Sequence, residues 1–107
     1  MPLPQSYSLS KPTLDFLARK HGHFIGGRWV PSASGATLDV HAPATEAKIA
    51  TVAAGDTVEI DAAVAAARRA FEGPWSRYTA AMRSDILWKI ADLVQKNAQQ
   101  LIELEIL

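Results

Sequence analysis

The 107-residue sequence contains no cysteine. This absence excludes disulfide bonds, thiolate-bound metals and a cysteine nucleophile from the chain as given. An excess of one charge is also lacking, because eleven Lys and Arg residues balance eleven Asp and Glu residues. Nucleic-acid-binding domains normally carry a clustered basic surface, so the neutral balance argues against nucleic acid as a partner.

Long hydrophobic runs are missing as well. No apolar run approaches the roughly 18 residues that a transmembrane helix needs, so we expect no membrane partner. The opening, MPLPQSYSLSKP, lacks the basic and then apolar order of a signal peptide. The composition is otherwise that of a folded protein, with 49% apolar and 21% charged residues. We therefore expect a soluble, cytoplasmic protein.

The first 22 residues are predicted to form a loose arm followed by a short helix. Prolines and serines without periodicity are typical of such an arm. Ser10 is placed to cap the helix, whose last turn would carry Arg19 and Lys20. Gly22 is placed to end it.

Short strands are predicted next, and they form a small antiparallel unit. Gly26 and Gly27 stand between two β-prone arms and fit the type I′ turn of a hairpin, which needs positive φ at both central positions. Alternating apolar and polar residues predict two further strands, over residues 37–41 and 48–53. The second half of the chain then changes to helical patterns.

The helical half begins at a capping box. Asp56 and Glu59 have the spacing at which each side chain accepts a hydrogen bond from the other residue's backbone N–H. The alanine-rich segment 57–71 is predicted to be helical and to end at Gly73 and Pro74.

A second, longer helix is predicted after Thr79, its N-cap. Run without a break from Ala80 to Leu107, it would be about 42 Å long. Its apolar stripe consists of Ile86, Ile90, Leu93, Val94, Leu101 and Leu104. The last residues, LIELEIL, stay apolar and carry no residue that typically closes a helix, so we expect the chain to be cut inside a longer protein.

No motif for catalysis is visible in the residues. His21 and His23 offer two imidazoles but no third ligand nearby, so we interpret them as solvated loop residues rather than a metal site. The glycine pair lacks the spacing of a phosphate-binding loop. The tryptophans are interpreted as core or hidden-interface anchors rather than a platform for stacking bases: Trp29, Trp75 and Trp88.

Three strings, in this order and spacing, resemble the N-terminal segment of the aldehyde dehydrogenase superfamily: FIGGRWVPSASGATLDVHAPAT, IATVAAGDTVEIDAAVAAARRAF and RSDILWKIADLVQKNAQQLIELE. The family pattern R-x-x-[IL]-L-x-x-[IL]-A-D-L runs here from Arg83 to Leu93. The resemblance covers Phe24 to Leu107. The preceding helix and the HGHFIGG junction also resemble phenylacetaldehyde-type members. One departure is Ala42, where the family usually has Asn before Pro-Ala-Thr.

The resemblance implies an α/β fold, the N-terminal portion of an aldehyde dehydrogenase-like cofactor-binding domain. Short antiparallel strands would precede two helices, the last one long and truncated. Residues 1–22 would form the arm and short helix. Residues 23–107 would form an incomplete N-terminal part of the NAD(P)-binding domain.

The resemblance also implies a homo-oligomeric parent enzyme that oxidises an aldehyde to a carboxylate with NAD or NADP. Family members use a cysteine thiolate, a glutamate-activated water and oxyanion donors for this chemistry. None of these groups falls in the matched stretch. We therefore expect no catalytic or cofactor-binding residue here, and neither activity nor NAD(P) binding from this chain alone.

One metal position follows from the resemblance. Many relatives hold a monovalent cation with backbone carbonyls at the strand end before Pro-Ala-Thr, which places Val40 and His41 at that position. An ordinary strand end is the alternative interpretation.

A different hypothesis for the whole chain also stays open. The chain would then be a genuine short protein that binds a partner, such as an intact dehydrogenase subunit, through the exposed apolar face of its helix.

Overall fold

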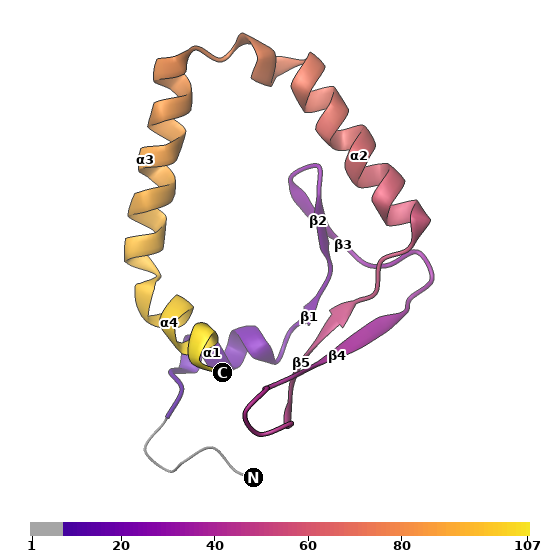
Figure 1. Ribbon diagram of the computed structural model, residues 1–107, viewed down its shortest axis with the longest axis vertical. Coiled ribbons are helices and arrows are strands. Elements are labelled where there is room, and N and C mark those ends of the chain that lie inside the picture. Colours follow the sequence, from indigo (N-terminus) through magenta and orange to yellow (C-terminus); the bar gives the residue numbers. More distant parts are fainter. Residues whose placement is uncertain (1–7) are drawn as a thin grey trace.

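A computed structural model describes residues 8–107, in which helices and strands follow one another around an open ring (Figure 1). The elements are α1 (Lys11–Leu17), β1 (Lys20–His21), β2 (His23–Ile25), β3 (Arg28–Val30), β4 (Thr37–His41), β5 (Lys48–Ala53), α2 (Thr57–Glu72), the 3-10 helix η1 (Pro74–Arg77), α3 (Ala80–Lys96) and α4 (Ala98–Ile106). Most of the predicted arm lies outside the described residues. No helix within residues 8–107 is long and apolar enough to cross a membrane.

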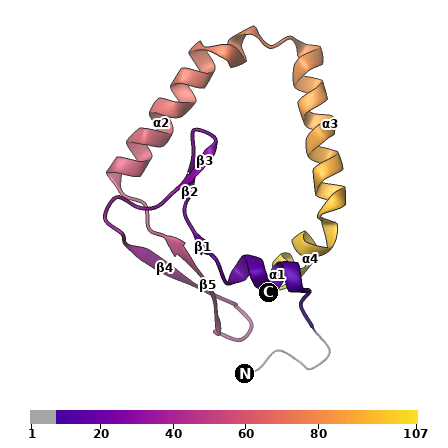
Figure 2. The same cartoon turned by 180° about the vertical axis from the view of Figure 1, so that it is seen from behind.

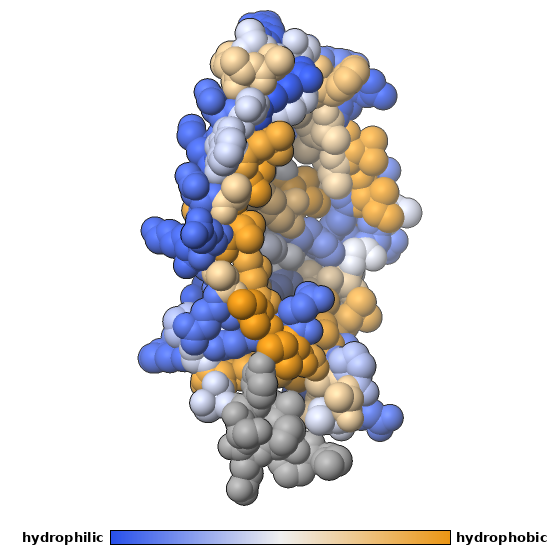
Figure 3. All heavy atoms as spheres, turned by 60° about the vertical axis from the view of Figure 1, so that its left-hand side comes forward, coloured by the Kyte–Doolittle hydropathy of each residue, from blue (hydrophilic) through white to orange (hydrophobic). Residues whose placement is uncertain are grey.

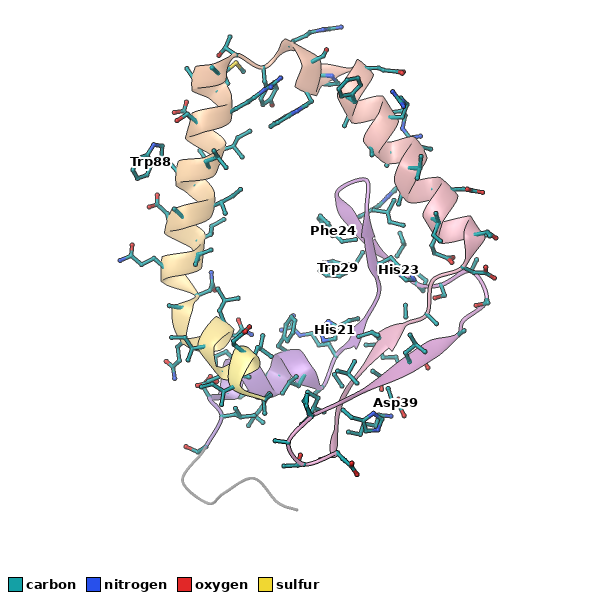
Figure 4. The ribbon with its side chains drawn as sticks, in the orientation of Figure 1. His21, His23, Phe24, Trp29, Asp39 and Trp88 are labelled. Carbon is teal, nitrogen blue, oxygen red and sulfur yellow. The ribbon has the colours of Figure 1, made fainter. Side chains whose placement is uncertain are left out.

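The glycine pair forms the predicted hairpin turn between β2 and β3. Gly26 and Gly27 have φ angles of 60° and 82°, which glycine adopts without steric cost. Phe24 lies opposite Trp29 in the antiparallel register, with 5.1 Å between the ring centroids. Both side chains point from the hairpin toward the middle of the ring (Figure 4).

The second sheet has three strands in the order β1–β5–β4. β4 and β5 have the predicted bounds and pair antiparallel, but β1 pairs parallel with β5. The prediction that Lys20 lies in a helical turn was therefore wrong. The predicted strands do pair antiparallel, and β1 is an additional strand that pairs parallel. Pairing with β5 satisfies the backbone groups of Lys20 and His21, and this tertiary contact outweighs the local helical pattern.

The capping box is confirmed at the start of α2. Glu59 accepts a hydrogen bond from the Asp56 backbone N–H over 2.8 Å, and the Asp56 carboxylate accepts one from the Thr57 N–H over 2.6 Å. Thr79 caps α3 as predicted, accepting the Met82 N–H over 3.2 Å. Local side-chain chemistry thus determines where both long helices begin.

The prediction of one unbroken helix from Ala80 to Leu107 was wrong. The helix breaks at Asn97, whose side-chain amide donates a hydrogen bond to the Leu93 carbonyl over 2.8 Å. Asn is prone to this competition with helical hydrogen bonds because its short side chain reaches nearby backbone groups. After the break, α4 turns and lies against α1 (Figures 1 and 2).

The contact between α1 and α4 is centred on a buried carboxylate, and Gln100 adds a hydrogen bond to the Pro12 carbonyl over 3.2 Å. Oε2 of Glu103 accepts hydrogen bonds from the Ser10 backbone N–H at 3.0 Å, from the Ser10 hydroxyl at 2.7 Å and from the Thr13 hydroxyl. Gln99 donates to the other oxygen over 3.0 Å. Ser10 occupies the predicted N-cap position, but its hydroxyl binds Glu103 instead of capping α1. We call this cluster of Ser10, Thr13, Gln99 and Glu103 the Glu103 joint.

Almost no apolar side chain is buried in the described part of the chain. Ala42 is the one buried hydrophobic residue there, whereas Trp29 and Trp88 are 65% and 70% exposed. The accessible surface is 8547 Å², against about 5,800 Å² for a compact monomer of this mass. The radius of gyration is 17.6 Å, against about 13 Å. The prediction of a tryptophan core was wrong, and that of a hidden interface stays a prediction.

The exposed apolar residues are not scattered. Figure 3 shows them gathered in a band along one side of the α3–α4 arm, with hydrophilic residues on the other side. The band includes Met82, Leu87, Ile90, Leu93, Val94, Leu101 and Ile102. Trp88 is separate from it and points outward from α3 (Figure 4).

The first prediction concerns the Glu103 joint. Four donors lower the pKa of Glu103 to about 2. A carboxyl whose pKa is lower in the folded state stabilises that state above its unfolded pKa, and this contribution is lost as the pH falls toward the folded value. We expect the contact between α1 and α4 to have its full stability at neutral pH, to weaken as the pH falls below the ordinary glutamate pKa of 4.5, and to be lost near pH 2.

Because the chain has no cysteine, Asp15→Cys in α1 and Glu105→Cys in α4 allow specific spin labelling. Paramagnetic resonance should give one narrow distance distribution, and Glu103→Gln should broaden it at neutral pH. The exposed Glu46→Gln serves as the matched control. An unchanged distribution in Glu103→Gln would show that the joint does not hold the two helices.

A second prediction concerns Gly22, which follows β1 and whose backbone lies close to Val30 of β3. A Cβ atom added here would collide with the Val30 carbonyl. Gly22→Ala should destabilise the folded state by about 1–3 kcal/mol, as overpacking does. The control is Gly55→Ala, whose added Cβ meets only the movable tip of the His23 ring at 3.1 Å. Hydrogen exchange at Thr51 and Val52 is the measurement, and equal rates in the two variants would contradict the prediction.

Candidate functional site

The predicted cation position lies where β4 ends in a tight turn. A bulge between Val40 and His41 interrupts the regular pairing with β5. Ala42 follows, and its backbone closes the turn: its N–H donates to the Ala47 carbonyl over 2.9 Å, and its carbonyl accepts from Glu46 over 2.8 Å. The backbone at this strand end is therefore fixed by its own hydrogen bonds.

The carboxylate nearest in sequence to this strand end already has partners. Asp39 forms an ion pair with Lys48 at 2.7 Å and accepts a hydrogen bond from the Thr51 hydroxyl at 3.3 Å. The hydrogen bond from Lys48 is the main cause that lowers the pKa of Asp39. Val40 and His41 thus offer backbone oxygens only, two of the six or so ligands that hard cations commonly take. These carbonyls alone make a partial site at most.

The two histidines do not behave as the sequence suggested. His21 lies in β1, with Nε2 2.8 Å from the Phe16 carbonyl, and His23 lies in β2, with Nε2 3.3 Å from the Ser32 hydroxyl. Both are half-buried, so the interpretation as solvated loop residues was wrong. Within residues 8–107, no three His, Cys, Asp or Glu side chains are placed to hold a metal ion.

Glu59 makes a second buried carboxylate joint, of which the sequence revealed only half. Its Oε2 completes the capping box, while Oε1 accepts the Ala33 backbone N–H over 2.7 Å. The hydrogen bond from Ala33 is the largest cause that lowers the pKa of Glu59, and that from Asp56 is the next. The loop after β3 is thereby tied to the first turn of α2. Nothing in the local pattern identifies Ala33, 26 residues away, as a partner.

This joint positions a groove between the β2–β3 hairpin and α2, which we call the hairpin–helix groove. Its volume is about 420 Å³. Apolar lining comes from Ile25 and Val30 on one side and from Val58, Ala62 and Ala65 on the other. Arg28 of β3 and Arg69 of α2 also line it. No local pattern predicts the groove, because its walls are distant along the chain.

The comparisons with known proteins point to one family. The model of the aldehyde dehydrogenase family matches residues 29–107. Aldehyde dehydrogenase 1 of Tanacetum cinerariifolium is 47% identical over 85 residues, which are 78% of this chain and 17% of that protein. Aldehyde dehydrogenase 1A1 of Gallus gallus is 41% identical over 106 residues, 97% of this chain and 21% of that protein.

Solved structures agree with this. The NAD+ complex of aldehyde dehydrogenase from Bacillus cereus is 39% identical with a TM-score of 0.86, over 92% of this chain and 20% of that one. The NAD+ complex of betaine aldehyde dehydrogenase from Staphylococcus aureus is 35% identical with a TM-score of 0.80, over 88% and 19%.

The predicted α/β fold is confirmed by this likeness. The chain spans about a fifth of the length of the relatives that it matches. Because the family model covers well over half of the sequence, the chain belongs to the aldehyde dehydrogenase family.

Proposed function

We propose that the protein containing this chain oxidises aldehydes to carboxylates with NAD as the hydride acceptor, and that this stretch frames the cofactor-binding domain. The observation that carries the proposal is the close match of the open ring to the NAD+ complex from Bacillus cereus, over 92% of the chain. NADP as an alternative cofactor, a homo-oligomeric enzyme and a cytoplasmic location belong to the same proposal.

The division of the chain follows from this role. Residues 1–22 supply the arm and α1, and residues 23–107 supply an incomplete N-terminal part of the NAD(P)-binding domain. The Glu103 joint holds α1 against α4, while the Glu59 joint sets the start of α2 against the β3 loop. Between the joints, the apolar band of α3 and α4 offers a surface for other parts of the domain to cover.

The start of α2 is poorly suited to bind the pyrophosphate of NAD. The N-terminus of a helix that follows a strand is where a pyrophosphate commonly binds. Here α2 follows β5, but Glu59 accepts the Asp56 N–H and the Asp56 carboxylate accepts the Thr57 N–H at that end. Two negative charges in this place disfavour a dinucleotide. We therefore assign NAD binding and the chemical steps to parts of the protein outside residues 8–107.

The experiment that tests the proposal is a chimera. Residues 8–107 replace the matching segment of the Bacillus cereus enzyme, and NADH formation is followed with a simple aldehyde. We expect aldehyde-dependent turnover, because the replacement preserves the backbone path and the apolar band. The same enzyme without any segment in this place should be inactive.

The isolated chain is the second control, and it should produce no NADH. A chimera that folds and binds NAD+ but shows no turnover would contradict the proposed role. Turnover by the isolated chain would contradict the assignment of chemistry to other parts of the protein.

We also propose that the Val40 and His41 carbonyls supply part of a monovalent-cation site that other parts of the protein complete. The bulge at this strand end, which interrupts the regular β4–β5 pairing, supports the proposal. Thermal midpoints should be higher for the chimera in sodium or potassium chloride than in tetramethylammonium chloride of equal ionic strength. For the isolated chain we expect no difference, because two carbonyls are too few. Equal midpoints for the chimera in all three salts would contradict this site.

A further inference from the structure

The hairpin–helix groove has the size and lining of a small-molecule site. Its volume of about 420 Å³ lies within the range of known ligand pockets, and most of its lining is apolar. The hairpin and α2 lie beside each other in both ribbon views (Figures 1 and 2). A ligand there would contact two walls that the Glu59 joint keeps in register.

Two arginines give the groove positive charge and hydrogen-bond donors. Within the described residues, neither Arg28 nor Arg69 forms an ion pair with a carboxylate. Among the arginines of the described residues, Arg68 is the one that pairs with a carboxylate, Glu72 at 3.7 Å, while Arg83 stacks on Trp75 at 5.0 Å. A guanidinium group without a carboxylate partner is suited to bind a planar carboxylate through two parallel hydrogen bonds.

The balance of charge selects the kind of anion. Glu59 also lines the groove, and its hydrogen bonds with Ala33 and Asp56 keep it ionised. Two arginines and one glutamate leave a single net positive charge. This matches a singly charged carboxylate better than a doubly charged phosphate, which the Glu59 charge would repel.

We propose that the hairpin–helix groove binds a small carboxylate with an apolar tail. The carboxylate lies between Arg28 and Arg69, and the tail lies between Val30 on one side and Val58 and Ala62 on the other. Burial of the tail makes the binding free energy more favourable as its apolar area increases. The arginines discriminate against uncharged molecules.

The test is a titration of the 15N-labelled chain with sodium octanoate, followed by amide NMR shifts. Shifts should concentrate in residues 25–33 and 58–69. Arg28→Gln and Arg69→Gln should each raise the dissociation constant by about tenfold or more, as loss of a hydrogen bond to a charged group does. Arg77→Gln, which removes the same charge from η1 outside the groove, should change it little. The uncharged 1-octanol, with the same tail, should bind more weakly than octanoate.

Several outcomes would overturn the proposal. These are equal binding of octanoate and 1-octanol, shifts spread over the apolar band of α3 and α4, and an equal loss in Arg77→Gln. Circular dichroism checks that each variant folds, and Arg28→Lys and Arg69→Lys, which keep the charge but lose the planar fork, should give intermediate losses.

Equilibrium dialysis of octanoate on the chimera repeats the comparison in a larger protein. One equivalent of bound octanoate per chimera chain should be lost in Arg28→Gln and retained in Arg77→Gln. Retention in both variants would overturn the proposal. Because binding is measured rather than turnover, failure of this site leaves the dehydrogenase proposal untouched.

Discussion

The buried carboxylate of Glu103 is the contact on which the open ring depends. It joins Ser10 and Thr13 of the α1 region to α4, across about 90 residues of sequence. Glu59 plays the same part at the other side of the ring, between α2 and the β3 loop. In most domains of this size an apolar core would hold such elements together. Here, where Ala42 is the one buried hydrophobic residue of the described chain, hydrogen-bonded carboxylates take over that task. Both are satisfied by several donors, which offsets the cost of burying a charge.

The exposed apolar surface indicates how the open ring fits into a larger protein. Side chains such as Leu93 and Ile90 are at least half exposed on a face that forms a continuous band (Figure 3). Exposed bands of this kind mark surfaces that another part of a protein covers. The relatives are about five times as long as the matched stretch, so the rest of such a protein is long enough to cover the band. The open ring and the near absence of a buried apolar core in residues 8–107 thus agree with a stretch that packs against other parts of a larger protein.

Local chemistry was enough to predict much of the fold. Gly26 and Gly27 set the hairpin, alternation set β4 and β5, and Asp56 and Thr79 set the beginnings of two helices. Each of these depends on neighbours within a few residues. Apart from the local helix break at Asn97, the errors arose where a distant partner determines the structure. Pairing with β5 made a strand of a predicted helical turn at Lys20, and Glu103 drew the Ser10 hydroxyl away from its cap. The hairpin–helix groove was not predicted for the same reason, because no local pattern indicates that Arg28 and Arg69 line the same groove.

We propose that other parts of an aldehyde dehydrogenase cover the apolar band of α3 and α4. Hydrogen–deuterium exchange, measured by mass spectrometry on peptides from residues 80–106, distinguishes a covered band from an exposed one. The isolated chain and the Bacillus cereus chimera are compared under the same conditions. We predict exchange that is slower by orders of magnitude in the chimera than in the isolated chain, because covering the band stabilises both helices. Equal protection in the two proteins would show that the helices need no cover, and would contradict the claim.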